Sequence, residues 1–412
     1  MHEKLISTLE NFINDYYGIV SAHNAKRVIS DFNHEWKIIA NYLGNDTSYW
    51  YTGNNRHKFI DGFSKYSIAL IILSAAYSNL SKIKENNIIN LQKLILEYEK
   101  NKNTSLELLP LRIVYSNLGI IWHKLGEKYD GKALEAFKKH IYYHITWSSN
   151  TKYLTTAYAF RKCNTFLYQS LINEQLNLSS PTSFNDPFDC PIMELLNDGN
   201  EISSLIHQAY KDCLKFACFT SNIKLPYNKD PKIWFSELVK DDKKHKEDKN
   251  EFLNSLMWAH YADSHRGICI KYSFFDSISR LGCEDKNIVA YFKDVKYSDT
   301  DTSKYTKNTI NFDDAFFHKG KEWEYENELR FLYYNLNDHG EHRSIDIPNC
   351  IEAIYFGVKC SEEDKEMIKN IMIDKELVIK DQNGNILGKE PIKFYQMKID
   401  EKHFGQIKAV KI

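Results

Sequence analysis

The sequence predicts an all-α N-terminal helical bundle followed by an α+β domain, divided near residue 150. Before that residue, apolar side chains recur three and four positions apart, which gathers them on one face of a helix. After it, short apolar or alternating stretches are separated by turn-forming residues, as is typical of strands and their connections. A length of 412 residues also suits two or three domains with ample cores. We therefore expect one domain over residues 1–150 and a second over residues 151–412.

The helical period runs through the whole first half. Ile29, Phe32, Trp36 and Ile39 show the spacing that places apolar side chains along one helix face. Short polar connections between the predicted helices favour antiparallel packing of neighbours. The predicted helices cover residues 3–20, 22–42, 57–80, 88–99, 108–125 and 132–144.

One helical pair of this half resembles a tetratricopeptide repeat, in which small residues let two helices approach closely. The resemblance is carried by Asn117, Leu118, Gly119, Trp122, Leu125, Gly126, Tyr129, Ala133, Ala136 and Phe137. Other helical pairs do not match the repeat clearly, so we expect an irregular repeat-like bundle ahead of a regular solenoid. The resemblance implies that this half senses or binds a protein partner, and plain scaffolding is the alternative.

The second half mixes strands and helices in the manner of an α+β domain. Its turn residues include the run 381–385, which has the chemistry of a hairpin connection. The predicted strands cover residues 155–160, 176–179, 216–220, 268–274, 288–297, 351–356, 377–380 and 386–388. The predicted helices cover residues 166–174 and 201–214, and residues 180–183 are expected to form a loop.

Residues 319–331 concentrate acids on one face of a predicted strand. Apolar residues and charged residues alternate in it, and strand pleating sends the two sets to opposite faces. The apolar set, at odd positions, is Trp323, Tyr325, Leu329 and Phe331, and the charged set, at even positions, is Glu324, Glu326, Glu328 and Arg330. Glu326 and Glu328 are therefore expected to point the same way, where each raises the proton affinity of the other and Arg330 offsets their repulsion. Such a pair suits acid/base chemistry. The alternative is an exposed strand with a solvated ladder of charges.

Composition excludes several classes of function. A hydrophobic content of 43%, a charged content of 26% and a net charge of -1 give no global attraction to nucleic acid or to an anionic membrane. The most apolar run, residues 66–77, is too short to span a bilayer. The first residues lack the pattern of a secretory signal, so a cytoplasmic protein is expected. The eight cysteines form no C-x-x-C pair, which argues against a zinc ribbon or a redox motif.

Four segments of the second half resemble the bacterial domain-of-unknown-function family 2971. They are 158–161 with the following strand to Ser179, 184–189 (Phe-Asn-Asp-Pro-Phe-Asp), 257–267, and 319–330. The resemblance covers roughly residues 155 to 400. In order and spacing these segments are also similar to the ADP-ribosyltransferase-like fold, as is the I-x-x-I run at 351–354. That similarity implies roles in using NAD for Arg161, for Ser179 or Ser180, and for Glu328.

The implied reaction gives each residue type a reason. Cleavage of NAD at the nicotinamide ribose develops positive charge on the sugar, which the carboxylate of Glu328 stabilises while Glu326 orients the nucleophile. The guanidinium of Arg161 suits a two-pronged grip on the cofactor diphosphate. Tyr261 or Trp258 could stack on a flat ring. The chain departs from well-known transferases in lacking a clear S-T-S triplet, which weakens the serine role.

Other polar residues have structural alternatives. His260, next to Tyr261, either belongs to the binding pocket or stabilises the helix before Gly267. Residues 185–189 most simply form a rigid turn, with Asp189 as the member best placed to face a ligand.

The histidine and cysteine patterns do not predict further chemistry. His260 and His265 are five residues apart, which does not place them on one helix face, so no metal site is predicted. Cys190 has no assignable base partner as a nucleophile.

The resemblance implies an NAD-dependent ADP-ribosyltransferase-like effector, such as a toxin or antiviral defence protein, that modifies nucleic acid or protein. NAD is then a substrate, and the macromolecular acceptor is open. One alternative is a non-enzymatic module that binds a nucleotide or a protein. Another is hydrolysis by the same acids, as in an NAD glycohydrolase or a nuclease, although neutral charge and the lack of a metal-binding carboxylate cluster count against a nuclease.

Overall fold

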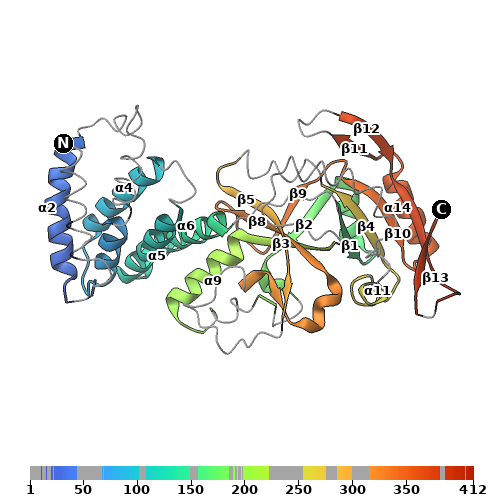
Figure 1. Ribbon diagram of the computed structural model, residues 1–412, viewed down its shortest axis with the longest axis horizontal. Coiled ribbons are helices and arrows are strands. Elements are labelled where there is room, and N and C mark those ends of the chain that lie inside the picture. The colour runs from blue at the N-terminus through green and yellow to red at the C-terminus, as the bar shows by residue number, and fades with distance from the viewer. Residues whose placement is uncertain are drawn as a thin grey trace. The chain divides into compact units, whose positions relative to one another are not determined.

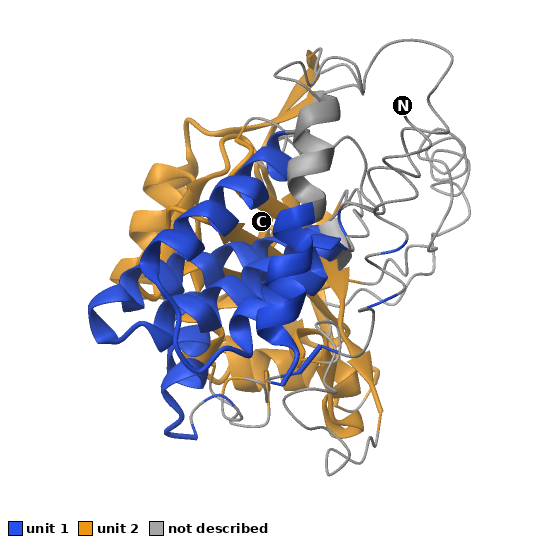
Figure 2. Ribbon diagram, turned by 90° about the vertical axis from the view of Figure 1, so that its left-hand side faces the viewer, with its two compact units in different colours: residues 1–148, 196–210 blue, residues 149–195, 211–412 orange. Residues whose placement is uncertain are grey.

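We analysed the protein through a computed structural model (Figure 1). It describes residues 11, 15, 20–21, 23–43, 67, 69–101, 108–148, 156–184, 189–190, 193, 196, 198–221, 254–274, 285–298, 315–380, 386–403 and 405–412. The chain forms two compact units (Figure 2). Unit 1 comprises residues 1–148 and 196–210, and unit 2 comprises residues 149–195 and 211–412.

The longer described segments of unit 1 are mainly helical. Its helices are α2 (Ala25–Leu43), α4 (Glu85–Asn101), α5 (Leu108–Lys124) and α6 (Asp130–Ser148), with a 3-10 turn η3 (Glu127–Tyr129) between the last two. Residues 69–78 are also helical. The predicted helix over residues 3–20 and the first part of the one over 57–80 lie almost wholly outside the described residues. No helix within the described ranges is long and apolar enough to cross a membrane.

Helices α5 and α6 form a closely packed pair. A Cβ atom added at Gly119 would lie 2.6 Å from Cε1 of Phe137, so this position of α5 accepts no side chain without movement of the ring. Trp122 is fully buried and stacks on Tyr129, with ring centroids 5.6 Å apart. The missing side chain at Gly119 and the stacking of Trp122 on Tyr129 together allow α5 and α6 to pack closely.

Helix α9 (Glu201–Cys213) is assigned mainly to unit 1, although it was predicted within the second half of the chain. Residues 201–210 belong to unit 1, and the helix ends in unit 2 where strand β3 begins. Sequence periodicity identifies such a helix but not the unit that it joins, because that depends on contacts between distant segments.

Unit 2 is built on a ten-stranded sheet. The order is β14-β13-β10-β4-β1-β3-β2-β9, and β8 pairs with β3 on one side and with β5 on the other. The sheet strands are β1 (Thr156–Arg161), β2 (Gln175–Ser179), β3 (Leu214–Thr220), β4 (Ile268–Ser273), β5 (Ile288–Asp294), β8 (Glu328–Asn335), β9 (His342–Asp346), β10 (Ile351–Phe356), β13 (Lys393–Ile399) and β14 (Ile407–Lys411). The predicted hairpin is present as β11 (Glu376–Lys380) and β12 (Ile386–Pro391).

Short elements connect these strands. They are the helices α7 (Thr165–Asn173), α11 (Ser255–Tyr261) and α14 (Glu362–Met372), the 3-10 turns η4 (Pro181–Ser183) and η7 (Lys321–Glu326), and the two-residue strands β6 (Lys296–Tyr297) and β7 (His318–Lys319). The predicted loop at 180–183 is therefore a 3-10 turn, with the Ser180 hydroxyl accepting a hydrogen bond from the Thr182 amide at its start.

Alternation along β1 and β8 divides the core of unit 2 between two sheet faces. Ala157, Ala159, Leu329 and Phe331 belong to one hydrophobic cluster, on which α7 and α14 also pack. A second cluster contains Phe160 of β1 together with Trp258 of α11 and Tyr355 of β10. The even-numbered residues of β8 therefore face away from the first cluster, and that direction places the candidate site.

The prediction of one strand across residues 319–331 is wrong for the first part of that segment. Residues 321–326 form the 3-10 turn η7, and β8 begins only at Glu328. Asn327, between them, has a left-handed backbone with φ of 42°. Asn tolerates this conformation better than most residues because its short polar side chain costs less there. Pleating therefore does not align Glu326 with Glu328, and their proximity has another cause.

Candidate functional site

The carboxylates of Glu326 and Glu328 meet at the ammonium group of Lys319. The Lys319 Nζ atom lies 2.8 Å from Glu326 Oε2 and 2.8 Å from Glu328 Oε2. The left-handed residue between the two acids turns the chain from η7 into β8, and the Thr220 hydroxyl fixes the turn by donating to the Glu326 carbonyl oxygen at 2.6 Å. The ammonium group of Lys319 therefore contacts both of the acids predicted from the sequence, Glu326 and Glu328.

Arg330 holds Glu328 and Asp189 from inside the sheet. Its side chain is 0% exposed, and its Nε atom lies 2.8 Å from Glu328 Oε1. Its Nη2 atom lies 2.7 Å from each carboxylate oxygen of Asp189, while Nη1 donates to the Phe316 carbonyl oxygen at 2.6 Å. All nitrogens of the guanidinium thus have partners in the protein. We call Asp189, Lys319, Glu326, Glu328 and Arg330 the ion cluster.

Electrostatics keep Glu328 and Lys319 of the ion cluster charged. Burial raises the pKa of Glu328, but Arg330 and Lys319 outweigh that effect and hold the pKa at about 2. Burial lowers the pKa of Lys319, and the neighbouring Glu328 and Asp189 more than reverse this, so its pKa lies above the usual range. The Glu328 carboxylate is consequently ionised at any physiological pH, which suits stabilisation of a developing cation and does not suit proton donation.

Aromatic side chains lie next to the ion cluster. The Tyr261 hydroxyl, at the end of α11, donates a hydrogen bond to Glu326 Oε1. Lys319 Nζ lies 5.6 Å from the ring centroid of Trp323. The His260 and Tyr325 rings are 6.3 Å apart, and His260 is exposed to solvent. We call His260, Tyr261, Trp323 and Tyr325 the aromatic patch, and its ring faces are of the kind that a planar ligand group stacks on.

Sequence reasoning selected Glu326, Glu328, Asp189, His260 and Tyr261, and the structure brings all five to this region. Asp189 does not project toward solvent, because it is buried against Arg330. Residues 185–188 of the predicted turn lie outside the described residues.

Arg161 is not brought to the ion cluster by its strand. It shares its parity along β1 with Ala157 and Ala159, which pack in the first hydrophobic cluster, whereas the β1 residue aligned with Glu328 through β3 is Tyr158. The Arg161 Nη1 atom donates to the Phe160 carbonyl oxygen at 2.9 Å. Alternation therefore directs Arg161 to the opposite face of the sheet.

Ser179 and Ser180 also lie apart from Glu328. Ser179 pairs with Phe216 of β3, while Glu328 pairs with Thr220, four residues further along the same strand. Four residues of extended strand correspond to about 13 Å. The Ser180 side chain is fully buried and contacts the Thr182 hydroxyl at 3.0 Å. These contacts give both serines a role in ending β2 and starting η4.

Lys319 and Tyr297 contact the acidic residues of the site and were not predicted as site residues. Lys319 stands at the start of the acidic segment, and its signal is a lone basic residue beside an unusual density of acids. Tyr297, from the end of β6, accepts a hydrogen bond from the Glu328 amide at 2.7 Å. That contact joins residues distant in sequence, and no local pattern indicates it.

Comparison with known proteins identifies a family that part of the chain resembles. No curated protein and no solved structure matches the chain. Residues 257–331 match the family described as "Protein of unknown function (DUF2971)". The match begins in α11 and ends in β8, so it includes Tyr261, Lys319, Glu326, Glu328 and Arg330, and the C-terminal unit thus carries a segment similar to this family.

Proposed function

We propose that unit 2 is an NAD-dependent ADP-ribosyltransferase-like enzyme whose reacting carboxylates are Glu326 and Glu328. The observation that carries the proposal is the pair of acids held 2.8 Å from one ammonium group beside the aromatic patch. A carboxylate fixed in its charged form by Arg330 and Lys319 needs no reorganisation when positive charge appears on a neighbouring sugar. We further propose that the protein acts as an effector, either a toxin or an antiviral defence protein.

In the proposed reaction, the bond between the ribose C1′ atom and the nicotinamide nitrogen breaks, and its electron pair leaves with nicotinamide. Glu328 stabilises the resulting oxocarbenium character. Glu326 orients the acceptor, whose nucleophilic atom bonds to C1′ and loses its proton to solvent or to this acid. Tyr261 and His260 offer ring faces to the nicotinamide or adenine ring. With water as acceptor, the same steps make an NAD glycohydrolase.

Arg161 is the weakest member of the proposed site. Its strand parity directs it to the other sheet face, but it is the last residue of β1, and a long side chain at a strand end can extend beyond it. We propose that it contacts the cofactor diphosphate from there. Loss of an NAD-induced rise in melting temperature in Arg161→Ala, with the rise retained in Arg343→Ala, would support this contact.

The activity is tested by incubating the full-length protein with NAD labelled in nicotinamide or in adenine, with and without nucleic acid and cell lysate. Released nicotinamide reports cleavage, and label retained on a macromolecule reports transfer. We expect Glu328→Gln to lower turnover about 100-fold or more, on the order of 3 kcal/mol, and Glu326→Gln to lower it less.

A matched control separates chemistry from folding. Glu352→Gln removes a partly exposed acid that pairs with Lys271 at 2.7 Å on β10 and β4, and it should leave turnover unchanged. Because Glu328 is buried, its variant must be assayed well below its own melting temperature. Parental rates in both Glu326→Gln and Glu328→Gln, under conditions in which the parent cleaves NAD, would reject the assignment.

A second candidate function is a non-enzymatic module that binds a nucleotide or a protein. The burial of the ion cluster favours it, since Glu328 is 5% exposed and its carboxylate is already paired with two cations. In that case NAD or another nucleotide would raise the melting temperature without any release of nicotinamide. The same labelled incubation therefore distinguishes the two candidates.

A further inference from the structure

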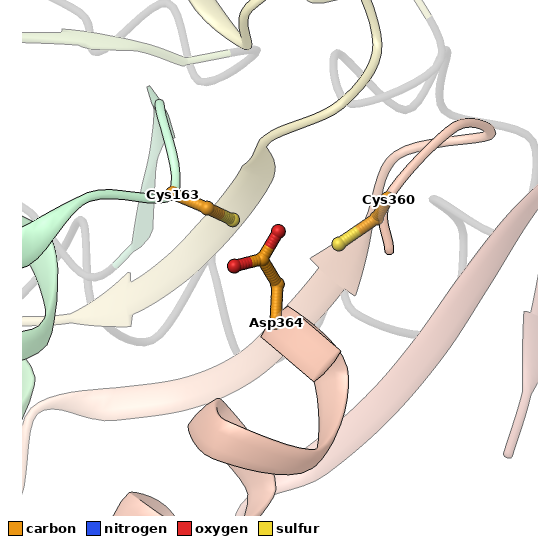
Figure 3. Close-up of side chains that lie close together, drawn as sticks. All are labelled: Cys163, Cys360 and Asp364. Atoms are coloured by element: carbon orange, nitrogen blue, oxygen red, sulfur yellow. The ribbon is translucent and has the colours of Figure 1, made fainter. Parts of the chain in front are cut away.

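Two thiols and one carboxylate converge in unit 2, outside the ion cluster (Figure 3). Cys163 follows β1, Cys360 follows β10, and Asp364 lies in the first turn of α14. Their ligand atoms, the two Sγ atoms and a carboxylate oxygen, all lie within 4.8 Å of one another. Figure 3 shows both sulfur atoms directed toward the carboxylate from opposite sides.

We propose that Cys163, Cys360 and Asp364 bind a thiophilic divalent cation, with zinc as the ion. Zinc takes Cys sulfur at about 2.3 Å and carboxylate oxygen at about 2.0–2.2 Å in a tetrahedron, so its ligand atoms lie roughly 3–4 Å apart. Two sulfur ligands select zinc over magnesium or calcium, which prefer oxygen alone. This site does not depend on the proposed enzymatic activity.

The carboxylate is already oriented by a second set of contacts. The Tyr168 hydroxyl donates to Asp364 Oδ1, and the Ser361 hydroxyl donates to Asp364 Oδ2 at 2.7 Å. Outer hydrogen bonds of this kind fix the direction of a metal-ligating group and strengthen binding. Each oxygen keeps a further lone pair, so coordination does not require either hydroxyl to leave.

The backbone around the thiols is also favourable. Asn164 and Ser361 are the N-cap residues of α7 and α14, so each cysteine immediately precedes the start of a helix. Two thiolates and one carboxylate give a zinc complex a net charge of about -1, and the positive ends of two helix dipoles stabilise it. The ligand group identified among the described residues has three members, which leaves the fourth position to water.

The site would join two distant turns of the chain. Cys163 follows the end of β1, Cys360 and Asp364 flank the N-cap of α14, and the Cys163 sulfur also lies 3.9 Å from the Arg266 carbonyl oxygen. A bound ion would therefore tie α7 and α14 together beside the turn that follows α11. Because zinc binds the folded state, it should raise the melting temperature.

The competing explanation is that Asp364 only caps α14 and the thiols only fill space. The test uses full-length protein purified under reducing conditions, stripped with a chelator and loaded with zinc or cobalt. We expect one zinc per chain by elemental analysis, and with cobalt an absorption band from thiolate-to-metal charge transfer. Both signals should disappear in Cys163→Ala and in Cys360→Ala, and Tyr168→Phe should weaken zinc binding by about 10–100-fold.

Control variants are available on the same elements. Cys350→Ala removes another buried cysteine of unit 2, and Glu363→Gln removes the exposed acid beside Asp364, so both should keep one zinc per chain. Because a cysteine variant could fail to fold, a second measurement uses the parent alone. Zinc should protect Cys163 and Cys360 from alkylation, and the chelator should abolish the protection. Zinc that remains in the Cys163→Ala/Cys360→Ala double variant, or thiols equally reactive with and without zinc, would overturn the proposal.

Discussion

At the scale of single residues, Arg330 organises the candidate site. It is fully buried and contacts Asp189, Glu328 and a backbone carbonyl oxygen at the same time. The guanidinium of Arg330 also lies over the ring of Phe184, with 5.1 Å between the guanidinium carbon and the ring centroid. Removing one member of a buried ion cluster leaves the others charged and unpaired, which costs more than the cluster contributes when intact.

Arg330→Met should therefore lower the free energy of unfolding by about 3–5 kcal/mol. Arg266→Met is the control, because the Arg266 side chain is 60% exposed and pairs at 3.1 Å with Asp263, whose side chain is 45% exposed. An exposed pair of this kind is worth about 0–1 kcal/mol. Urea unfolding of both variants measures the difference, and equal losses would show that the ion cluster has no special structural role.

A partly buried pair of histidines in α6, His140 and His144, makes unit 1 sensitive to acid. Burial lowers the pKa of His140 to about 4 and the pKa of His144 to about 3, against 6.5 for the ordinary side chain, and the charge of Arg112 adds to both effects. The His140 Nδ1 atom lies 2.8 Å from the Arg112 carbonyl oxygen, a contact that selects the neutral tautomer protonated at Nδ1 and offsets only part of the effect of burial on the pKa. At pH values below 6.5, the ordinary pKa, and above the pKa values of the folded state, the unfolded chain binds more protons than the folded chain.

Unit 1 should thus lose stability as the pH falls from about 6.5 to about 4, by about 1.4 kcal/mol per pH unit for each histidine. Hydrogen exchange at the amides of α5 and α6 reports this unit alone. His140→Gln should reduce the slope by about half, while His23→Gln, at an exposed position, should leave it unchanged. A parental slope near zero between pH 6.5 and 4.5 would contradict the assignment.

At the scale of elements, the sequence predicted segments whose apolar pattern is local. Helices α5 and α6, strands β1, β4 and β10, and the β11–β12 hairpin appear within a few residues of their predicted bounds. Strand β9 was missed because four of its five side chains are exposed, so no apolar alternation marks it. Helix α14 was not predicted, although Ser361 and Asp364 form a capping pair, which is a local sequence signal for the start of a helix.

The candidate site was predictable only in part, for a related reason. Alternation correctly drew attention to Glu326 and Glu328 but gave the wrong cause of their proximity, because the left-handed Asn327 interrupts the strand. Arg161 and Ser179 were assigned by resemblance, and strand register places them away from Glu328. Register depends on pairing between distant strands, which neither composition nor local period determines.

The α5–α6 hairpin offers a direct test of close packing. Gly119→Ala puts a Cβ atom 2.6 Å from the Phe137 ring, and such overpacking should cost about 1–3 kcal/mol of unfolding free energy. Gly131→Ala in α6 meets nothing within 4 Å, and it should be neutral or stabilising by up to about 1 kcal/mol because Ala is the better helix former. The unfolding free energies of the two variants, measured by thermal unfolding, should therefore change in opposite directions or differ from each other by more than about 1 kcal/mol. Equal midpoints would show that the ring moves freely.

At the scale of the whole molecule, the two units are not simple successive halves of the chain. Strands β1 and β2 belong to unit 2, whereas residues 196–210, which follow them in the sequence, belong to unit 1. Cutting the chain near residue 150 would therefore leave most of α9 without the helices that it joins. Any test of whether unit 1 governs unit 2 should use the full chain with a substitution confined to unit 1.

Trp122→Ala is such a substitution, since Trp122 is 1% exposed and packs on Tyr129 inside the α5–α6 hairpin. The cavity that it leaves should lower the stability of unit 1 by about 3 kcal/mol or more. If unit 1 restrains or directs the proposed activity, growth of cells expressing Trp122→Ala should differ from growth of cells expressing the parent at equal protein level. The Trp122→Ala/Glu328→Gln double variant should abolish that difference, because the effect acts through the carboxylate of unit 2. A difference that persists in the double variant would place the effect in unit 1 itself, and no difference at all would show that unit 1 neither restrains nor directs the site.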